Sequence, residues 1–219
     1  MFNEEVIAKV RKTPIIAVLV IDAAEDAVPL AKALMAGGVF ATELTLRTPA
    51  AFEAIDRIRQ ELPEILLGVG TILNAEQVRA VKERGAAFGV APGLNSSVVM
   101  AAKEFSLPFA PGVMTPTEIE SAFALGCSVM KFSPAELVGG LKYLKNVNAP
   151  YAHLGIKYIP LGGVSLENLE SYLGCPDVLA IGGSWLAPRK LIQEKAWKEI
   201  SKNCEDAMKI AAKVRGSNG

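Results

Sequence analysis

One lysine lies inside a short apolar stretch and could act as a nucleophile. Lys131 is flanked by Val129, Met130 and Phe132, a pattern that predicts a buried strand. Burial of an ammonium group removes its hydration and favours the neutral amine. Because a neutral amine adds to a carbonyl carbon, we predict that Lys131 forms a Schiff base with a substrate. The alternative is a structural lysine that extends to solvent or pairs with a carboxylate only for stability.

The segment Ala41–Thr48 carries charged residues at alternate positions of another expected strand. Side chains two residues apart on a strand share a face, so Glu43, Thr45 and Arg47 should point the same way. A carboxylate near Lys131 could move protons during catalysis, and we assign that role to Glu43. A structural ion pair between Glu43 and Arg47 is the alternative.

Paired glycines follow two late apolar runs and indicate an anion site. Gly162–Gly163 and Gly182–Gly183 each lie at the expected end of a strand. Exposed backbone N–H groups and helix N-termini attract anions, so we predict that these turns bind a phosphate group. The run Gly68–Thr71 ends an earlier strand, and its glycines should let a ligand or backbone approach. The Thr71 hydroxyl could contact a ligand there or cap the following turn.

Eight short apolar runs alternate with alanine-rich segments that have helical spacing. The predicted strands are Ile15–Ile21, Phe40–Leu46, Leu66–Ile72, Phe88–Pro92, Pro108–Gly112, Val129–Phe132, Lys157–Leu161 and Val178–Ile181. Helix starts are indicated by Thr48–Pro49, Asn74–Gln77, Thr115–Glu118 and Ser165. Pro29 predicts a late start or a bend in the first of these helices.

The alternation of eight strands with helices predicts an α/β fold, a (βα)8 TIM barrel in a single domain over residues 1–219. Residues 1–14 should form an N-terminal helix, residues 186–215 the C-terminal helices and residues 216–219 a loose tail. Reactive groups of such a barrel lie at the carboxyl ends of its strands, which agrees with the residues singled out above. A doubly wound open sheet is the alternative fold, since the same alternation permits it.

Composition narrows the class of protein. The 23 basic residues equal the 23 acidic ones, so charge gives no reason to expect nucleic acid or an acidic membrane as a partner. No apolar run approaches the roughly 20 residues of a membrane helix, and the first residues lack the features of a signal peptide. Three dispersed cysteines predict reduced thiols and a cytoplasmic location. The single histidine, His153, gives little basis for a metal site, and we expect no cofactor.

Taken together, these motifs resemble the 2-keto-3-deoxy-6-phosphogluconate (KDPG) aldolase and 4-hydroxy-2-oxoglutarate (KHG) aldolase family. The resemblance extends from about Val18 to Trp185. It rests on the segments Glu43–Thr48, Gly68–Thr71, Ala91–Gly93, Pro111–Gly112, Lys131–Glu136, Gly162–Gly163 and Ile181–Trp185. The family implies a class I aldolase on a βα barrel, typically a homotrimer.

The resemblance also implies a role for each matching residue. Lys131 corresponds to the Schiff-base lysine, and Glu43 to the general acid/base, which works partly through a bound water. Arg47 and Thr71 correspond to ligands of the pyruvyl carboxylate. Pro92 and Phe132 correspond to residues that shape the pocket, and the phosphate-binding set corresponds to Gly162, Gly163, Gly183 and Ser184.

Membership of this family would imply reversible cleavage of a 2-keto-3-deoxy sugar acid. The expected reactions are cleavage of KDPG to pyruvate and glyceraldehyde 3-phosphate, of 4-hydroxy-2-oxoglutarate to pyruvate and glyoxylate, or of both. Ser133 replaces a second aromatic residue and Leu161 a threonine of many members, which leaves the preferred aldehyde and the stereochemistry at C4 open. The fold leaves open whether a phosphate is required, since such barrels host many reactions. Two other interpretations remain: a phosphate-binding barrel epimerase or synthase in which Lys131 acts only as an acid, and a non-catalytic sugar-acid binding protein.

Overall fold

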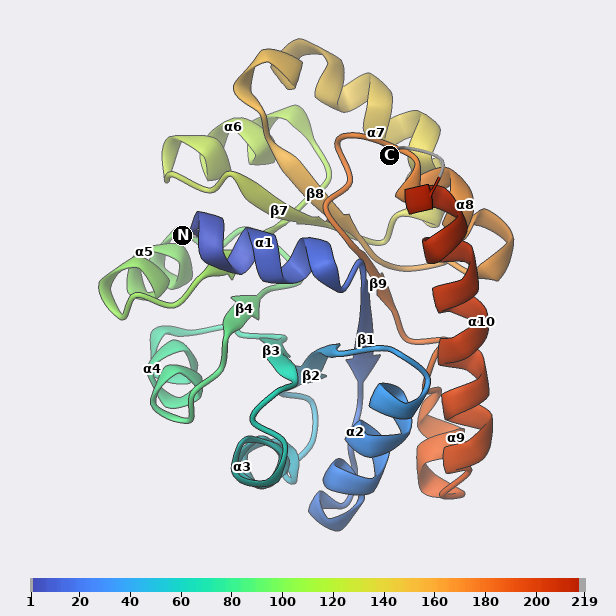
Figure 1. Cartoon of the computed structure of the whole chain (residues 1–219). Coiled ribbons are helices and arrows are strands. Elements are labelled where there is room, and N and C mark those ends of the chain that lie inside the picture. Colours follow the sequence, from blue (N-terminus) through green and yellow to red (C-terminus); the bar gives the residue numbers. More distant parts are fainter. Residues whose placement is uncertain (1, 217–219) are drawn as a thin grey trace.

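Parallel strands curl around the centre of the molecule, and helices lie outside them (Figure 1). The computed structural model describes residues 2–216. The strands are β1 (Ile15–Leu19), β2 (Ala41–Thr45), β3 (Leu66–Gly70), β4 (Phe88–Val90), β5 (Phe109–Ala110), β6 (Gly112–Val113), β7 (Val129–Phe132), β8 (Lys157–Pro160) and β9 (Ile181–Gly183). One parallel sheet has the order β5-β4-β3-β2-β1-β9, and a second has the order β6-β7-β8.

Hydrogen bonds outside the regular ladders join the two sheets on both sides. Pro111 separates β5 from β6, and its carbonyl accepts a hydrogen bond from Lys131 N at 2.8 Å. On the other side, Leu179 N donates to Tyr158 O at 2.8 Å, and Val178 forms a parallel bridge with Tyr158. Strands that follow one another along the chain are therefore neighbours in space. This order lacks the reversal that defines the doubly wound alternative.

The helices alternate with the strands along the chain. Their bounds are α1 (Glu4–Lys12), α2 (Ala27–Ala36), α3 (Ala51–Glu61), α4 (Ala75–Glu83), α5 (Ser96–Glu104), α6 (Pro116–Ala124), α7 (Gly140–Asn148), α8 (Leu166–Leu173), α9 (Arg189–Gln193) and α10 (Trp197–Gly216). Short 3-10 turns occupy Ala24–Asp26, Glu136–Val138 and Ala149–Leu154. Among residues 2–216, no helix is long and apolar enough to cross a membrane.

Strand alternation divides the apolar side chains between an inner and an outer layer. Ile16 and Val18 of β1 belong to the inner cluster, together with Val6 and Val10 of α1. Leu19 belongs to the outer cluster, which packs against the surrounding helices. Helix α1 runs across the amino-terminal ends of the strands and covers the inner cluster there (Figure 1). The carboxyl ends of the strands are left for polar residues.

Several predicted helix starts are confirmed by their capping bonds. Thr115 caps α6 in a full capping box, in which Thr115 N donates to Glu118 Oε2 at 2.8 Å. Asn74 caps α4 by accepting from Gln77 N at 2.8 Å. These helices therefore begin where local side-chain chemistry alone specifies a start.

Two helix starts predicted near the amino terminus lie where neighbouring structure affects the beginning of the helix. Pro29 lies in α2, which begins late, after a 3-10 turn, as predicted. The prediction from Thr48–Pro49 is wrong, because α3 begins only at Ala51. The Thr48 hydroxyl instead donates to Ile21 O at 2.5 Å, so it joins the β2 loop to the end of β1.

The last predicted strand and the predicted tail also differ from the structure. The segment Cys175–Val178 forms a turn, in which Val178 N donates to Cys175 O at 3.0 Å. Because of this turn, Val178–Ile181 is not a continuous strand, and β9 begins at Ile181. Helix α10 includes Gly216, the first residue of the predicted loose tail. Residues 217–219 of that tail lie outside the described residues.

Candidate active site

A hollow of about 290 Å³ lies at the carboxyl ends of the strands. It is lined by Val18, Glu43, Thr45, Arg47, Thr71, Pro92, Lys131, Ser133, Leu161, Gly162, Gly182 and Ser184. The predicted site residues that it brings together are Glu43, Arg47, Thr71, Pro92, Lys131, Gly162 and Ser184. They come from segments distributed over most of the chain, as expected for a site at the carboxyl ends of parallel strands.

Lys131 and Glu43 form an ion pair inside this hollow. Lys131 Nζ lies 2.8 Å from Glu43 Oε1, and the two side chains are only 10% and 3% exposed. The residues are 88 apart in the sequence, and they extend toward each other from β7 and β2. An amine within hydrogen-bond distance of a carboxylate can exchange a proton with it. The contact therefore brings an amine that could act as a nucleophile next to a carboxylate that could move its proton.

Gly70 provides the space that the Glu43 carboxylate occupies. A Cβ atom at Gly70 would lie 2.1 Å from Glu43 Oε1, so any side chain at this position would displace the carboxylate. At Gly68, a Cβ atom would lie 2.2 Å from the ring of Phe88. We expected these glycines to admit a ligand or backbone, and they instead admit two side chains. One of these side chains is the carboxylate that contacts Lys131.

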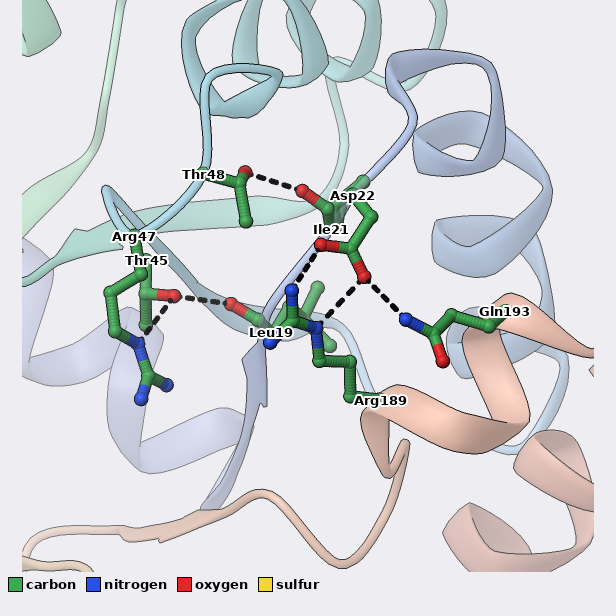
Figure 2. Close-up of polar contacts among 8 residues, drawn as sticks. All are labelled: Leu19, Ile21, Asp22, Thr45, Arg47, Thr48, Arg189 and Gln193. Carbon is green, nitrogen blue, oxygen red and sulfur yellow. Dashed lines mark hydrogen bonds and ion pairs between the residues drawn. The ribbon is translucent and has the colours of Figure 1, made fainter.

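Arg47 lies just after β2 and bonds to Thr45, the last residue of that strand, rather than to Glu43 (Figure 2). Arg47 Nε donates to Thr45 Oγ1 at 3.1 Å, and the Thr45 hydroxyl donates to Leu19 O at 2.8 Å. The alternative of a structural Glu43–Arg47 ion pair is therefore wrong. The bond to Thr45 leaves the end of the guanidinium group available at the edge of the hollow.

Thr71 has an unusual backbone conformation. Its φ of 60° lies in the left-handed region, which β-branched residues rarely adopt. Such conformations persist where the surrounding structure enforces them, and they cluster at functional sites. The following helix, α4, is capped by Asn74 rather than by Thr71. The position of Thr71 in the wall of the hollow therefore favours contact with a ligand over a capping role.

Gly163, in the turn after β8, and Ser184, directly after β9, border a second hollow of about 470 Å³. The predicted Gly182–Gly183 turn is wrong, because both glycines lie in β9 and pair with β1. Gly162 lines the first hollow, Gly163 lines the second, and Ser184 lines both. Gly162 and Gly163 have φ values of 90° and 86°, which favour glycine. Glu136 N donates to Gly162 O at 3.0 Å and joins this turn to the loop after β7. The Gly162–Gly163 turn therefore lies beside the hollow that contains Lys131.

Two predicted site residues line neither hollow. Phe132 alternates with Lys131 along β7, so its ring faces the outer layer and stacks on Tyr143 with centroids 6.1 Å apart. Phe132 therefore does not form the pocket wall as predicted, and Ser133 lines the hollow instead. Gly183 is buried beside Trp185, whose Nε1 would lie 2.7 Å from a Cβ atom at this glycine.

A polar cluster at the end of β1 was not expected from the sequence (Figure 2). Arg189 donates to both Asp22 oxygens, at 2.8 and 2.5 Å, and Gln193 donates to Asp22 Oδ2 at 2.8 Å. The hydrogen bonds from Arg189 and then Gln193 lower the pKa of Asp22 to about 2. Arg189 also lines the second hollow. The sequence contained a signal, since Asp22 directly follows the predicted strand Ile15–Ile21.

A parallel α/β scaffold that buries a lysine against a carboxylate at its strand ends is suited to an aldolase that works through an imine. A family model described as KDPG and KHG aldolase matches residues 6–203. The chain belongs to the KDPG and KHG aldolase family. Its members are lyases, and the resemblance of the separate motifs is thereby confirmed over most of the chain.

Individual relatives support the same assignment. The 2-dehydro-3-deoxy-phosphogluconate aldolase of Haemophilus influenzae is 41% identical over 208 residues, which cover 95% of this chain and 97% of that protein. The KHG/KDPG aldolase of Escherichia coli K12 is 40% identical over 198 residues, or 90% and 92% of the two chains. The crystal structure of KDPG aldolase from Legionella pneumophila has a TM-score of 0.87 at 35% identity and covers 92% of this chain and 97% of its own. It contains pyruvate captured as a covalent carbinolamine intermediate.

Proposed function

We propose that this protein is a class I aldolase that reversibly cleaves a 2-keto-3-deoxy sugar acid through a Schiff base on Lys131. The substrates are KDPG, which yields pyruvate and glyceraldehyde 3-phosphate, and 4-hydroxy-2-oxoglutarate, which yields pyruvate and glyoxylate. The observation that carries the proposal is the buried contact of 2.8 Å between Lys131 and Glu43. The names of the relatives and the carbinolamine in the Legionella pneumophila enzyme support it.

The proposed mechanism uses these two side chains in sequence. Lys131 passes a proton to Glu43, and its neutral amine then adds to the C2 carbonyl carbon. Glu43 returns this proton as water leaves, which gives a protonated imine and restores the carboxylate. The imine withdraws electrons, so the C3–C4 bond breaks once the C4 hydroxyl loses its proton to Glu43 through a water molecule. The aldehyde leaves, and the resulting enamine is protonated at C3 by the same carboxyl group. Hydrolysis of the imine then releases pyruvate and restores the amine.

The remaining residues bind the two ends of the substrate. Arg47 and Thr71 bind the pyruvyl carboxylate, because one offers guanidinium N–H groups and the other a hydroxyl in the wall of the hollow. Pro92 contributes an apolar part of the same wall. The phosphate binds near Gly162, Gly163, Gly183 and Ser184. Gly162 and Gly163 form a turn at the two hollows, whereas Gly183 ends β9 and positions Ser184, which lines both hollows.

We further propose that the strands close into one (βα)8 barrel, so that residues 1–219 form a single aldolase domain. The hydrogen bonds from Lys131 N to Pro111 O and from Leu179 N to Tyr158 O support closure, because they join the two sheets on both sides. The amino-terminal helix and the carboxyl-terminal helices belong to this same domain. Hydrogen exchange of these joining amides tests closure, since protection close to that of the central strands is expected.

For the assembly and location, we propose a homotrimer in the cytoplasm. Leu73 and Met100 are 53% and 52% exposed, and such large apolar side chains would favour an interface. The cysteines are free and buried, which fits a reducing compartment. Sedimentation should give three times the chain mass of 23.2 kDa, and a monomer would contradict the trimer.

Borohydride trapping with pyruvate tests the proposed function. We expect a reduced pyruvyl adduct in the intact mass, and peptide mapping should place it on Lys131. The Lys131→Ala variant should show no adduct, although its circular dichroism should match that of the wild type. If no adduct forms under conditions that label a known pyruvate aldolase, the imine mechanism is wrong. An epimerase or synthase in which Lys131 acts only as an acid would then be the better interpretation.

A further inference from the structure

Arg47 is an exposed side chain that depends on one buried hydroxyl group for its orientation (Figure 2). Arg47 is exposed at the edge of the hollow, whereas Thr45 is 1% exposed. Arg47 Nε donates to Thr45 Oγ1 at 3.1 Å. An exposed arginine populates many rotamers, and a hydrogen bond to a fixed acceptor restricts that freedom.

The Thr45 hydroxyl is itself held in one orientation. Its hydrogen is donated to Leu19 O at 2.8 Å, at the end of the neighbouring strand β1. A hydroxyl that has donated its hydrogen can present only lone pairs to other groups. Thr45 therefore accepts from Arg47 and cannot turn to donate elsewhere while the bond to Leu19 O exists.

We propose that Thr45 is a positioning residue that orients Arg47 toward the carboxylate of the 2-keto acid. Engagement of Nε by Thr45 leaves the two terminal Nη groups of Arg47 free for the two oxygens of a carboxylate. Thr45 does not touch the substrate carboxylate in this arrangement, and it acts through Arg47. The inference rests on the proposed function, in which Arg47 binds the pyruvyl carboxylate.

A purely structural role for Thr45 would give a different result in a matched comparison. Thr48 provides the control, because its hydroxyl donates to Ile21 O at 2.5 Å and it also joins the β2 side to the end of β1. Among the residues drawn in Figure 2, no hydrogen bond joins Thr48 to Arg47. Loss of the Thr48 hydroxyl thus removes a similar link without changing the support of the guanidinium group.

The test measures the pyruvate concentration that half-saturates borohydride trapping. Pyruvate consists of a methyl, a keto and a carboxylate group and lacks the aldehyde-derived part of the substrate. Its carboxylate is the only charged group, so a change in this concentration at constant imine formation reports the carboxylate site. We expect Thr45→Val to raise it about tenfold, as expected for a lost hydrogen bond to a charged group, with the final extent of trapping unchanged. Thr45→Ser should restore it to within about twofold of the wild type, and Thr48→Val should leave it within about twofold.

A second comparison, in a protein that already carries Arg47→Lys, distinguishes a positioning role of Thr45 from general destabilisation of the fold. Lysine lacks the guanidinium Nε–H that donates to Thr45. In an Arg47→Lys protein, the further change Thr45→Val should therefore raise the half-saturating pyruvate concentration by less than about twofold. Thermal unfolding of each variant checks that it is folded. A half-saturating concentration in Thr45→Val equal to that of the wild type would overturn the inference, and so would a tenfold effect that persists in the Arg47→Lys background.

The same series distinguishes failure of this inference from failure of the proposed function. If the wild-type protein forms no adduct, calorimetric affinity for pyruvate replaces trapping as the readout, because binding does not require an imine. The Thr45 effect should then appear in that affinity and vanish in the Arg47→Lys background. A wild-type protein that neither traps nor binds pyruvate would overturn the inference together with the carboxylate site.

Discussion

The lysine side of the active site (Glu43, Thr45 and Lys131) is buried, whereas the glycine side (Gly163 and Ser184) faces solvent. On the lysine side, the polar groups belong to particular side chains: Lys131 donates to the Glu43 carboxylate, and the Thr45 hydroxyl donates to the backbone carbonyl of Leu19, both at 2.8 Å. On the glycine side, the turns offer backbone N–H groups, whose chemistry is the same for every residue type except proline.

Because of this difference, substitutions on the lysine side and on the glycine side should affect the protein to different extents. Removal of one partner from a buried polar pair leaves the other without compensation, which costs several kcal/mol as an order of magnitude. Exposed groups keep water as a substitute partner, so their loss costs less. We therefore expect the reaction itself to depend strictly on the lysine side, and the choice of substrate to depend gradually on the glycine side.

The largest effect should come from Lys131→Ala, which removes the proposed nucleophile. The kcat of the retro-aldol reaction should fall by about 10⁴ or more, because a covalent pathway is lost. Pyruvate release, followed with a coupled lactate dehydrogenase assay, measures this. Lys157→Ala changes a lysine of the neighbouring strand β8 that bonds to Pro176 O, and it should retain activity. A Lys131→Ala enzyme within tenfold of the wild type would contradict the importance of the lysine side.

Glu43→Gln should have the next largest effect, because an amide retains the shape but not the basicity of the carboxylate. We expect kcat to fall by about 10² to 10⁴. Exchange of the pyruvate methyl protons with deuterated water should fall by a similar factor, since the enamine is protonated by the same group. Exchange at the wild-type rate would assign proton transfer to another residue.

Gly70→Ala should impair catalysis without altering any polar group. Its Cβ atom would lie 2.1 Å from Glu43 Oε1, so the carboxylate must move away from Lys131. We expect a decrease in kcat of about 10², comparable to partial loss of the acid/base group. Gly93→Ala is the matched control, because nothing lies within 4 Å of its Cβ position. Equal activities of the two variants would show that the position of Glu43 is not critical.

On the glycine side, Gly163→Ala should change substrate preference more than rate. Its φ of 86° strains any other residue, and its Cβ would lie 2.5 Å from Glu136 Cβ, so the turn must shift. We expect KM for KDPG to rise about tenfold and KM for 4-hydroxy-2-oxoglutarate to change much less. Gly155→Ala introduces similar strain, with a φ of 69°, in open space away from the site. Equal changes for both substrates would refute phosphate binding at this turn.

The smallest effect should come from Arg189, which is 56% exposed and paired with Asp22. Arg189→Gln should raise KM for KDPG about two- to threefold at low ionic strength, and added salt should remove the difference. Asp22→Asn should lower the same KM slightly, because it frees a positive charge beside the second hollow. If KM for KDPG changed in the same direction in Arg189→Gln and Asp22→Asn, an electrostatic role of Arg189 would be excluded.

Much of the fold and site could be predicted from local patterns. The strand Val129–Phe132 has the bounds expected from the sequence, and Thr115 forms the predicted capping box. These features depend on residues only a few positions apart. Thr48–Pro49 contains a similar capping signal, but α3 begins only at Ala51, and the Thr48 hydroxyl donates to the distant Ile21 O. The same local signal therefore specifies the helix start at Thr115 but not at Thr48.

The sequence by itself determined which residues could react: a lysine in an apolar strand, a carboxylate on an alternating face and two glycine pairs. Only the tertiary structure decided their partners. In the folded chain, Lys131 Nζ lies 2.8 Å from Glu43 Oε1, and Arg47 donates to Thr45. The Glu43 carboxylate occupies the space left by the missing side chain of Gly70. Residue type and alternation are encoded locally, whereas a contact between side chains 88 residues apart exists only when the strands that carry them meet.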